Sequence, residues 1–506
     1  MFSMTFISVL LIVLACIAIS YFILNYRQRA SIKAVNTLPG PRTFPLIGSA
    51  YYFLRRSLDD FLAILVKLSE DYPSPFKFWI GRKLFITIYE PDQMKAILYN
   101  NLDKSTIYEF FESVMGKEGL ITAPVSTWAK SRKVIAPSFN NNMLRNYFDI
   151  FVEQSLIMAD KLEKIGLKEN KVILYEHISK YALSTTFGTM TGMKDLSINE
   201  IDQCLDVAER VRKTFRSRMR NVFLYFNFIF NLTAMGREQR KNINFMHSLK
   251  DKIMQQKIYA LKEQETKSNY ETTPRTFLDI LIEMSHKDIW PQEMINDHSI
   301  TTFLAAFDTT TVTIDFVIFM LANFPEMQEK AYKELLEIYG TKTPKFAPIK
   351  YEDIQYMNFL DRSIKETMRI FPTIPIVGRH LTEDVKMGEF ILPKGADVLL
   401  EIFVLHRNKK YWPNPLVFDP DRFLPEKKET YTSYFMPFSI GSRNCIAFAG
   451  MNYAMISMKV VLATLIRTFV FKVDKTIAID KIKLNADLAL SPVEPLEVKI
   501  EKRDQN

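Results

Sequence analysis

The run Phe438–Cys445 (FSIGSRNC) constrains this chain more than any other feature. Only two further cysteines, Cys16 and Cys204, occur in the 506 residues. Because the run contains Gly441 and precedes a long apolar segment, it predicts a loop that leads into the start of a helix. The helix dipole and the backbone N–H groups at such a position favour the charged form of a thiol. We therefore expect a fold that holds Cys445 as a thiolate.

The neighbours of Cys445 indicate what such a thiolate would do. Arg443 lies two residues before it and adds positive charge. A hydrogen-bonded thiolate inside a protein is one of the ways to hold haem iron, and it donates electron density to the metal. The alternative is a small buried apolar cysteine, as most free cysteines are. Phe438, Gly441 and Arg443 favour the haem-ligand interpretation.

Composition and charge narrow the class of protein. Apolar residues make up 48% of the chain, enough for a large core. Three scattered cysteines cannot form a disulfide framework, which predicts a reducing compartment for the catalytic part. The net charge is +9 without an arginine-rich tract, so nucleic acid is not the expected partner. This charge suits an anionic membrane face, an acidic protein partner or an ordinary solvated surface.

The first 24 residues carry no charged side chain. At a rise of ~1.5 Å per residue they can cross a hydrocarbon core of ~30 Å. Arg27, Arg29 and Lys33 follow and place the downstream side in the cytosol. We expect residues 1–26 to be an uncleaved transmembrane signal-anchor and residues 27–48 to be a basic, proline-rich hinge. A cleaved signal peptide, the alternative, would carry its basic residues before a shorter apolar stretch.

Residues 49–506 are expected to form one catalytic domain, mainly α with a smaller β region. Whether it divides into a helical lobe and a small β-rich lobe stays open. The patterns predict a hairpin over residues 75–89, mostly helix over 91–324 with one long apolar helix at 299–323, and helices at 354–371 and 450–469. They also predict short strands at 374–377 and 390–398 and a terminal hairpin over 482–500. The apolar stretch 220–236 indicates either core or a surface dipping into a membrane.

The middle of the long predicted helix contains Ala305-Ala-Phe-Asp-Thr-Thr-Thr311. An aspartate followed by three threonines disfavours the interior of a helix, although the surrounding apolar pattern predicts one. Such a disagreement between local preference and fold is expected at functional sites. Beside a haem, Asp308 and Thr309 could supply protons and hold water. The alternative is a helix distortion in which each threonine hydroxyl bonds a carbonyl one turn back.

Two further groups of charged residues are candidates for structural or cofactor contacts. Glu366 and Arg369 lie three residues apart on a largely apolar helix, and we expect Arg422 to complete a buried network with them. Trp128 and Arg132 share one helix face, where an indole N–H and a guanidinium suit a carboxylate such as a haem propionate. Simple cation–π packing is the alternative for this second pair.

Taken together and in this order, the motifs resemble the cytochrome P450 family of haem-thiolate monooxygenases over residues 38–500. The resemblance implies that family's mainly α fold, with haem b held without covalent bonds except for ligation of its iron by Cys445. Asp308 and Thr309 would form the oxygen-activating pair. The other residues expected at the cofactor are Trp128, Arg132, Ala305, Arg379, Phe438, Gly441 and Arg443.

Within the family, Asp308-Thr309-Thr310 and Asn444-Cys445-Ile446 are similar to the animal family 4, or fatty-acid ω-hydroxylase, clade. Two positions depart from that pattern. That clade often has a glutamate at position 305 that forms an ester with the haem, which Ala305 cannot do. Ala447 stands where family members usually have glycine two residues after the cysteine.

The resemblance implies a monooxygenase of the endoplasmic reticulum membrane, single-pass, with a cytosolic catalytic domain. It would insert one atom of O₂ into a lipophilic substrate, namely a fatty acid, hydrocarbon, terpenoid or xenobiotic. Electrons from NADPH would arrive through a flavoprotein reductase, with cytochrome b5 as a further partner. The alternatives are a haem-thiolate isomerase or dehydratase and a catalytically silent membrane-bound binder of hydrophobic ligands.

Overall fold

The computed structural model describes residues 35–44, 47–54, 61–193, 196–221, 224, 227–266, 275–340, 347–486 and 489–503. The predicted anchor and the first residues of the hinge lie outside these ranges. The chain divides into two compact units, one of Met1–Thr106 with Gly378–Glu401 and the other of Ile107–Val377 with Ile402–Asn506. The sequence had left this division open.

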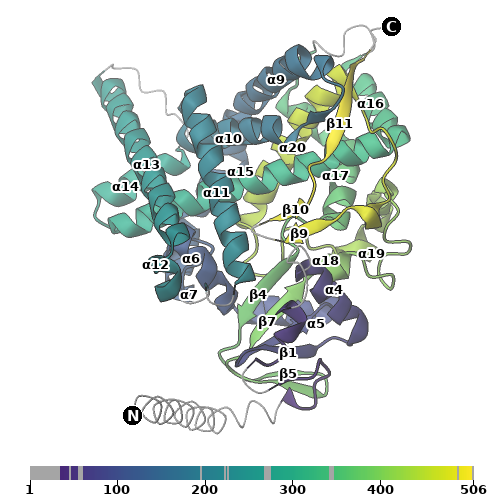
Figure 1. Cartoon of the computed structure of the whole chain (residues 1–506). Helices are drawn as coiled ribbons and strands as arrows, with labels where there is room; N and C mark the ends of the chain where they lie inside the picture. The colour runs from purple at the N-terminus through teal and green to yellow at the C-terminus, as the bar shows by residue number, and fades with distance from the viewer. Residues whose placement is uncertain are drawn as a thin grey trace, which may run out of the picture. The chain divides into compact units, whose positions relative to one another are not determined.

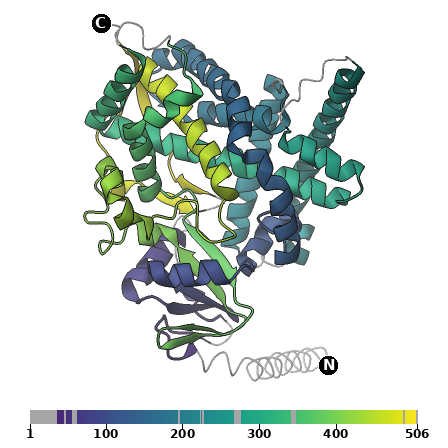
Figure 2. The same cartoon turned by 180° about the vertical axis from the view of Figure 1, so that it is seen from behind.

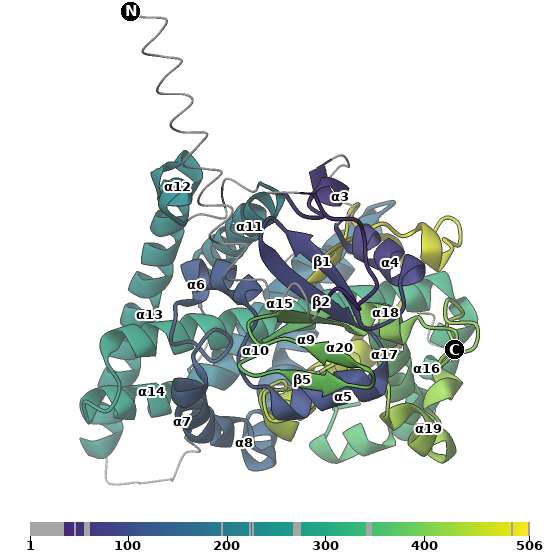
Figure 3. The same cartoon turned by 90° about the horizontal axis from the view of Figure 1, so that it is seen from below.

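The first unit is built on a sheet with the strand order β1-β2-β7-β4. Strands β1 (Phe76–Ile80) and β2 (Lys83–Ile88) form the predicted hairpin around Gly81, which has a positive φ of 58°. β2 pairs in parallel with β7 (Asp397–Glu401), and β4 spans Ile376–His380. Figure 3 shows β1 and β2 beside α4 (Phe61–Asp71). The unit also contains α3 (Tyr51–Leu54), α5 (Pro91–Asn100) and the pair β5 (Val385–Met387) and β6 (Phe390–Leu392).

The second unit is mainly helical, as expected. Its α-helices are α6 (Glu109–Met115), α7 (Val125–Ile135), α8 (Asn141–Asn146), α9 (Phe148–Ile165), α10 (Tyr175–Thr191), α11 (Ile198–Arg220), α12 (Asn227–Leu232), α13 (Ala234–Thr266), α14 (Phe277–His286), α15 (Gln292–Asn323), α16 (Pro325–Tyr339), α17 (Asn358–Ile370), α18 (Ile402–His406), α19 (Lys428–Thr432) and α20 (Ala447–Thr468). Short 3₁₀ turns occur at Thr106–Tyr108, Ala136–Phe139, Gly166–Lys168, Tyr351–Tyr356, Pro420–Phe423, Pro425–Lys427 and Ile479–Lys481.

Helix α15 runs through the middle of this unit and packs on α10, α17 and α20 (Figure 1). Every residue from Thr310 to Asn323 is buried, which explains the apolar composition of its C-terminal half. It is long and apolar enough to span a membrane, but 78% of that apolar window is buried inside the protein. The helix starts at Gln292, seven residues before the predicted start, because its first two turns are polar and follow Pro291.

The C-terminal strands differ from the predicted hairpin. β9 (Leu484–Ala486) and β10 (Leu490–Pro492) pair with each other, whereas β11 (Glu497–Lys502) joins β8 (Phe469–Lys472) and β3 (Val172–Ile173) in the order β3-β11-β8. The prediction of one hairpin over 482–500 was therefore wrong in its second half. Helix α20, yellow-green in Figure 2, belongs to the same unit and begins at Ala447, two residues after Cys445.

Candidate functional site

The loop that ends at Cys445 closes on itself. The Cys445 N–H donates to the Phe438 carbonyl over 3.1 Å, and the Asn444 N–H donates to the Gly441 carbonyl over 3.3 Å. Gly441 has a φ of +79°, a conformation that favours glycine. Helix α20 begins two residues after Cys445. The backbone thus places the thiol at a helix start, as the sequence predicts.

The Cys445 side chain is exposed, although protein atoms crowd around it. Burial raises the pKa of the Cys445 thiol, whereas the Ile446 N–H and the Arg132 guanidinium lower it. Both facts fit a thiol that protein surrounds but does not cover. Among the described residues, no cluster of three or more His, Cys, Asp and Glu side chains could hold a metal ion. An accessible thiol at a helix start is one of the ligand types that hold haem iron.

Arg132 of α7 holds the cysteine loop from one side. Its guanidinium donates to the Asn444 carbonyl over 2.8 Å, to the Asn444 side-chain oxygen over 2.7 Å and to the Cys445 carbonyl over 3.3 Å. These bonds fix the residue before the thiol as well as the thiol's own backbone. A contact of Arg132 with a propionate remains a prediction.

Two guanidinium groups lie close to the Trp128 ring. Its ring is 5.7 Å from the Arg132 guanidinium and 5.1 Å from that of Arg443, and the indole is 6% exposed. Arg443 also donates to the Ala123 carbonyl. The cation–π packing weighed as the alternative is therefore present in the structure, and the propionate roles of Trp128 and Arg443 stay predictions.

Glu366 and Arg369 are fully buried and form a network with Arg422, which is 13% exposed. Arg369 donates to both Glu366 carboxylate oxygens, over 2.7 and 2.8 Å. Arg422 forms an ion pair of 3.3 Å with the same carboxylate, and the Asp419 N–H donates to it over 3.1 Å. Arg369 further donates to the carbonyls of His406 and Pro415. Every oxygen of Glu366 is thereby engaged, which offsets the cost of burying its charge.

The threonines of α15 bond the helix itself. The Thr309, Thr310 and Thr311 hydroxyls each donate to the carbonyl four residues earlier, over 2.8 Å. This is the back-bonding weighed as the alternative, and α15 stays continuous through it. Because its hydrogen points to the Ala305 carbonyl, the Thr309 oxygen retains lone pairs that can accept a hydrogen bond.

Asp308 is 14% exposed and has a partner that the sequence did not indicate. The Arg212 guanidinium of α11 lies 3.7 Å from its carboxylate and also donates to the Tyr175 hydroxyl. Burial raises the pKa of Asp308, Arg212 lowers it and Glu209 raises it further. Sequence reasoning missed Arg212 because α11 is rich in arginine and nothing in its spacing singles out this one.

The remaining candidates are Arg379, Ala305, Phe438 and Ala447. Arg379 belongs to the first unit, where it is buried and donates to the Asn101 and Gly378 carbonyls. Its predicted role at the cofactor therefore stays a prediction. Ala305 and Phe438 are partly exposed in the second unit. Ala447 is the first residue of α20.

Apolar side chains gather beside the Asp308 turn. Val114 and Met115 of α6, Val207 and Val211 of α11 and Ile300 of α15 form one buried cluster. Phe111, Ile121 and Leu304, which are partly buried, pack against it.

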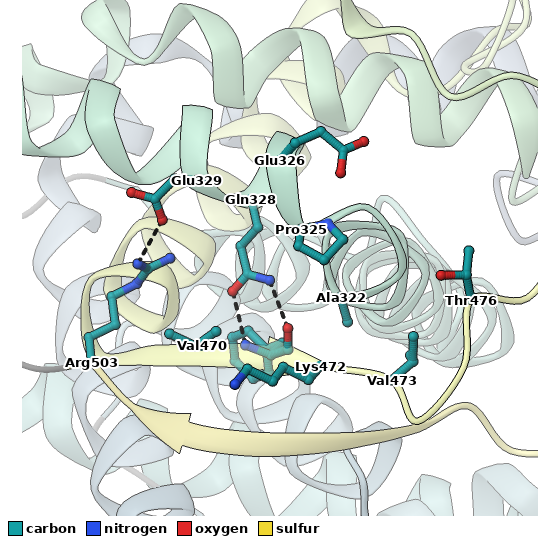
Figure 4. Close-up of a pocket in the computed structure, with 11 residues that line it drawn as sticks. Ala322, Pro325, Glu326, Gln328, Glu329, Val470, Lys472, Val473, Thr476 and Arg503 are labelled. Atoms are coloured by element: carbon teal, nitrogen blue, oxygen red, sulfur yellow. Dashed lines mark hydrogen bonds and ion pairs between the residues drawn. The ribbon is translucent and has the colours of Figure 1, made fainter.

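A pocket of about 510 Å³ lies elsewhere in the second unit, between α16 and β8 (Figure 4). Its walls include Gln328, which bonds the backbone of Phe471, and Arg503, which pairs with Glu329 over 3.2 Å. None of the predicted site residues lines it.

Comparisons with known proteins agree with this geometry. The family described as Cytochrome P450 matches residues 38–500. Cytochrome P450 4c21 of Blattella germanica is 30% identical over 519 residues, covering 99% of both chains. Cytochrome P450 4A7 of Oryctolagus cuniculus is 31% identical over 88% of this chain and 86% of its own length. Cytochrome P450 4V2 of Mus musculus is 28% identical over 95% of this chain and 92% of its own.

Proposed function

The chain belongs to the cytochrome P450 family, and we propose that Cys445 is the thiolate that ligates its haem iron. Membership makes the protein a haem-thiolate monooxygenase, similar to family 4 enzymes. The observation that carries the assignment to Cys445 is its accessible thiol at a helix start, in a loop closed by its own hydrogen bonds and held by Arg132. Cys204, by contrast, is buried at 3% exposure.

The cofactor and the chain divide the work. When bound, the haem supplies the chemistry that activates O₂. The chain supplies a thiolate whose backbone is fixed by Arg132 and by the Phe438 carbonyl. This rigidity keeps the sulfur at one position relative to the start of α20.

Proton supply falls to α15 in this proposal. The Thr309 oxygen accepts a hydrogen bond from water, since its own hydrogen is donated to Ala305. Burial raises the pKa of the Asp308 carboxyl, which makes it a candidate to hold and pass on a proton, and Arg212 orients it. The apolar cluster around Val211 and Leu304 excludes water from the same region and suits a lipophilic substrate.

We further propose that NADPH-derived electrons arrive through a flavoprotein reductase, with cytochrome b5 as a second donor, at the cytosolic face of the endoplasmic reticulum. Support comes from the uncharged first 24 residues and the basic residues after them. Helix α12 adds a second apolar surface, because Phe228 is 76% exposed and Leu232 65% exposed. Both side chains suit contact with lipid.

Oxygen isotope transfer tests the proposed reaction. The full chain, reconstituted with haem, reductase and NADPH, is incubated with ¹⁸O₂ and a set of fatty acids, hydrocarbons and terpenoids. We expect one ¹⁸O atom in a hydroxylated product and consumption of NADPH that depends on the substrate. Products carrying oxygen from a supplied peroxide, formed without NADPH, would instead indicate an isomerase or dehydratase.

A further inference from the structure

The segment 116–122 (GKEGLIT), which joins α6 to α7, is attached to α15 by one carboxylate. Asp297 lies in the N-terminal part of α15 and is 7% exposed. Its Oδ2 atom accepts a hydrogen bond from the Glu118 N–H over 2.9 Å. Burial raises the pKa of Asp297 to about 6, and the backbone N–H groups of Glu118 and Lys117 act against that rise. The charge of this carboxylate is therefore favoured by the backbone of the segment.

The two glycines of the segment leave room for this close approach. A Cβ atom on Gly116 would overlap the Asp297 carboxylate, and Gly116 also has a φ of +69°, which other residues rarely adopt. A Cβ atom on Gly119 would overlap the hydroxyl of Thr301, one turn further along α15. A loop that only connects two helices has no such requirement. The two glycines therefore fit the segment closely to α15.

Both ends of the segment are held as well. Next to its first residue, the Met115 carbonyl accepts a hydrogen bond from the Thr301 hydroxyl over 3.2 Å. Next to its last residue, the Ala123 carbonyl accepts a hydrogen bond from Arg443 of the cysteine loop. Residues 116–122, which we call the strap, thus run from α15 towards the cysteine loop, and Asp297 holds them between these two end contacts.

Apolar side chains of the strap pack against the region that we assign to a lipophilic substrate. Ile121 packs against the buried cluster of α6, α11 and α15 beside the Asp308 turn. Leu120 packs against a second cluster, which includes Ile295 of α15 and is also contacted by Ile446, the neighbour of the proposed iron ligand. Because the strap lies against both clusters, its position determines how easily an apolar molecule reaches α15 and the cysteine loop.

We propose that Asp297 is a positioning residue that keeps the strap closed over the substrate region and thereby restricts the size of the molecules that reach the haem. The inference rests on the proposed function and deepens it. The carboxylate accepts hydrogen bonds from the strap, whereas an alanine at this position would accept none. Without the carboxylate the strap keeps only its end contacts, so it opens more often while the helices stay in place. Large ligands gain more from this opening than small ones, because they need a wider gap.

Amide hydrogen exchange of the full chain tests the contact itself. D297A should speed exchange in residues 116–122 about tenfold or more, while α9 and α20 keep their wild-type rates. D297N retains one side-chain acceptor and should lie between wild type and D297A. E293A removes an exposed carboxylate one turn earlier on α15 and should match wild type. G116A should reproduce D297A, because its methyl group displaces the carboxylate.

Binding of a small and a large azole to the haem-loaded chain tests the consequence. Imidazole and dodecylimidazole carry the same iron-binding ring, and the Soret shift reports the binding of each. We expect D297A to speed association of dodecylimidazole about three- to tenfold and to change that of imidazole by less than about twofold. In wild type, the association rate of dodecylimidazole should level off at high concentration, because opening of the strap becomes limiting, whereas that of imidazole should rise linearly.

Three outcomes overturn the proposal. The first is identical exchange of residues 116–122 in D297A and wild type, which would mean that the carboxylate does not hold the strap. The second is an equal change in the association of both azoles, which would indicate a purely structural role. The third is a linear rise for both azoles in wild type, which requires no variant to fold. None of these measurements depends on oxygen transfer, so failure of the isotope experiment would count against the proposed function and not against Asp297.

Discussion

Arg369 and Arg218 are buried to the same degree but differ in what surrounds their charges. Arg369 is 0% exposed and faces Glu366 through two hydrogen bonds, with Arg422 and two backbone carbonyls completing the set. Arg218 is 1% exposed and meets only neutral oxygens. The first network is complete within the chain, whereas the second lacks an anion.

The two arginines therefore differ in whether the chain itself supplies the opposite charge. In the first network, Glu366, Arg369 and Arg422 compensate one another's charges within the chain. Residues facing the α11 and α15 side include charges that burial leaves uncompensated, among them Arg218 and Asp315. Such groups lower the stability of the protein and are retained where they contact ligands or move protons.

Removing the counter-charge from the complete network should have the largest effect. Glu366→Gln leaves Arg369 buried without an anion, and we expect a loss of about 3–5 kcal/mol in the free energy of unfolding, measured by urea denaturation. Asp160→Asn is the control, since Asp160 pairs with Lys164 on the surface and should change stability by less than about 0.5 kcal/mol. Equal stability of the two variants would contradict the contrast.

Replacing Asp315 should raise the stability of the protein, whereas replacing Glu366 lowers it, and the effect should depend on pH. It is 4% exposed, and burial raises its pKa to about 7. Its neutral form stabilises the fold fully below the unfolded pKa of ~3.9, and this contribution is lost as pH rises towards about 7. We therefore expect Asp315→Asn to match wild type at about pH 4 and to exceed its stability by about 2–4 kcal/mol at about pH 8.

Unfolding midpoints at the two pH values give the measurement for Asp315. Asp160→Asn again serves as the control, because its exposed side chain should give the same small difference at both pH values. A stability difference for Asp315→Asn that does not grow with pH would show that this carboxyl is compensated after all.

A substitution at the cysteine loop should have a smaller effect than the substitutions of Glu366 and Asp315. Arg132→Gln removes a charged donor that makes three hydrogen bonds to residues 444 and 445. We therefore expect the loop to hold haem less strongly, by about 1.5–3 kcal/mol in binding free energy. The readout is faster transfer of haem to a scavenging protein. Lys130→Gln changes an exposed residue of the same helix and should leave haem retention unchanged. If Arg132→Gln retains haem as well as wild type does, Arg132 does not stabilise the cysteine loop.

The smallest expected effect is on the use of electrons rather than on stability. Thr309→Ala removes the proposed acceptor for water, so at least about twofold less product should form per NADPH, with hydrogen peroxide making up the difference. Thr311→Ala removes an identical helix bond from a buried position and should keep normal coupling. The same peroxide yield from both variants would assign Thr309 a purely helical role.

The sequence predicts those parts of the structure that are determined by residues close to one another in the chain. The hairpin around Gly81 follows from a turn between two apolar runs, and the end of α15 follows from Pro325. The loop of Cys445 is recognisable from its glycine and its position before a helix. In contrast, the pairing of Arg212 with Asp308 and the isolation of Arg218 depend on which helices pack together. Helical spacing alone could not distinguish these two arginines from the others on α11. The split of the C-terminal strands has the same cause, because β11 pairs with β3, more than 300 residues away.

The absorption spectrum of the reduced, carbon monoxide-treated protein tests the central claim most directly. With Cys445 as the iron ligand, the wild-type chain should give the long-wavelength Soret band of a thiolate-ligated haem, and Cys445→Ser should lose that band. Cys204→Ser, which changes a buried cysteine, should retain it. A Cys445→Ser protein with full haem content and the unchanged wild-type band would contradict the account.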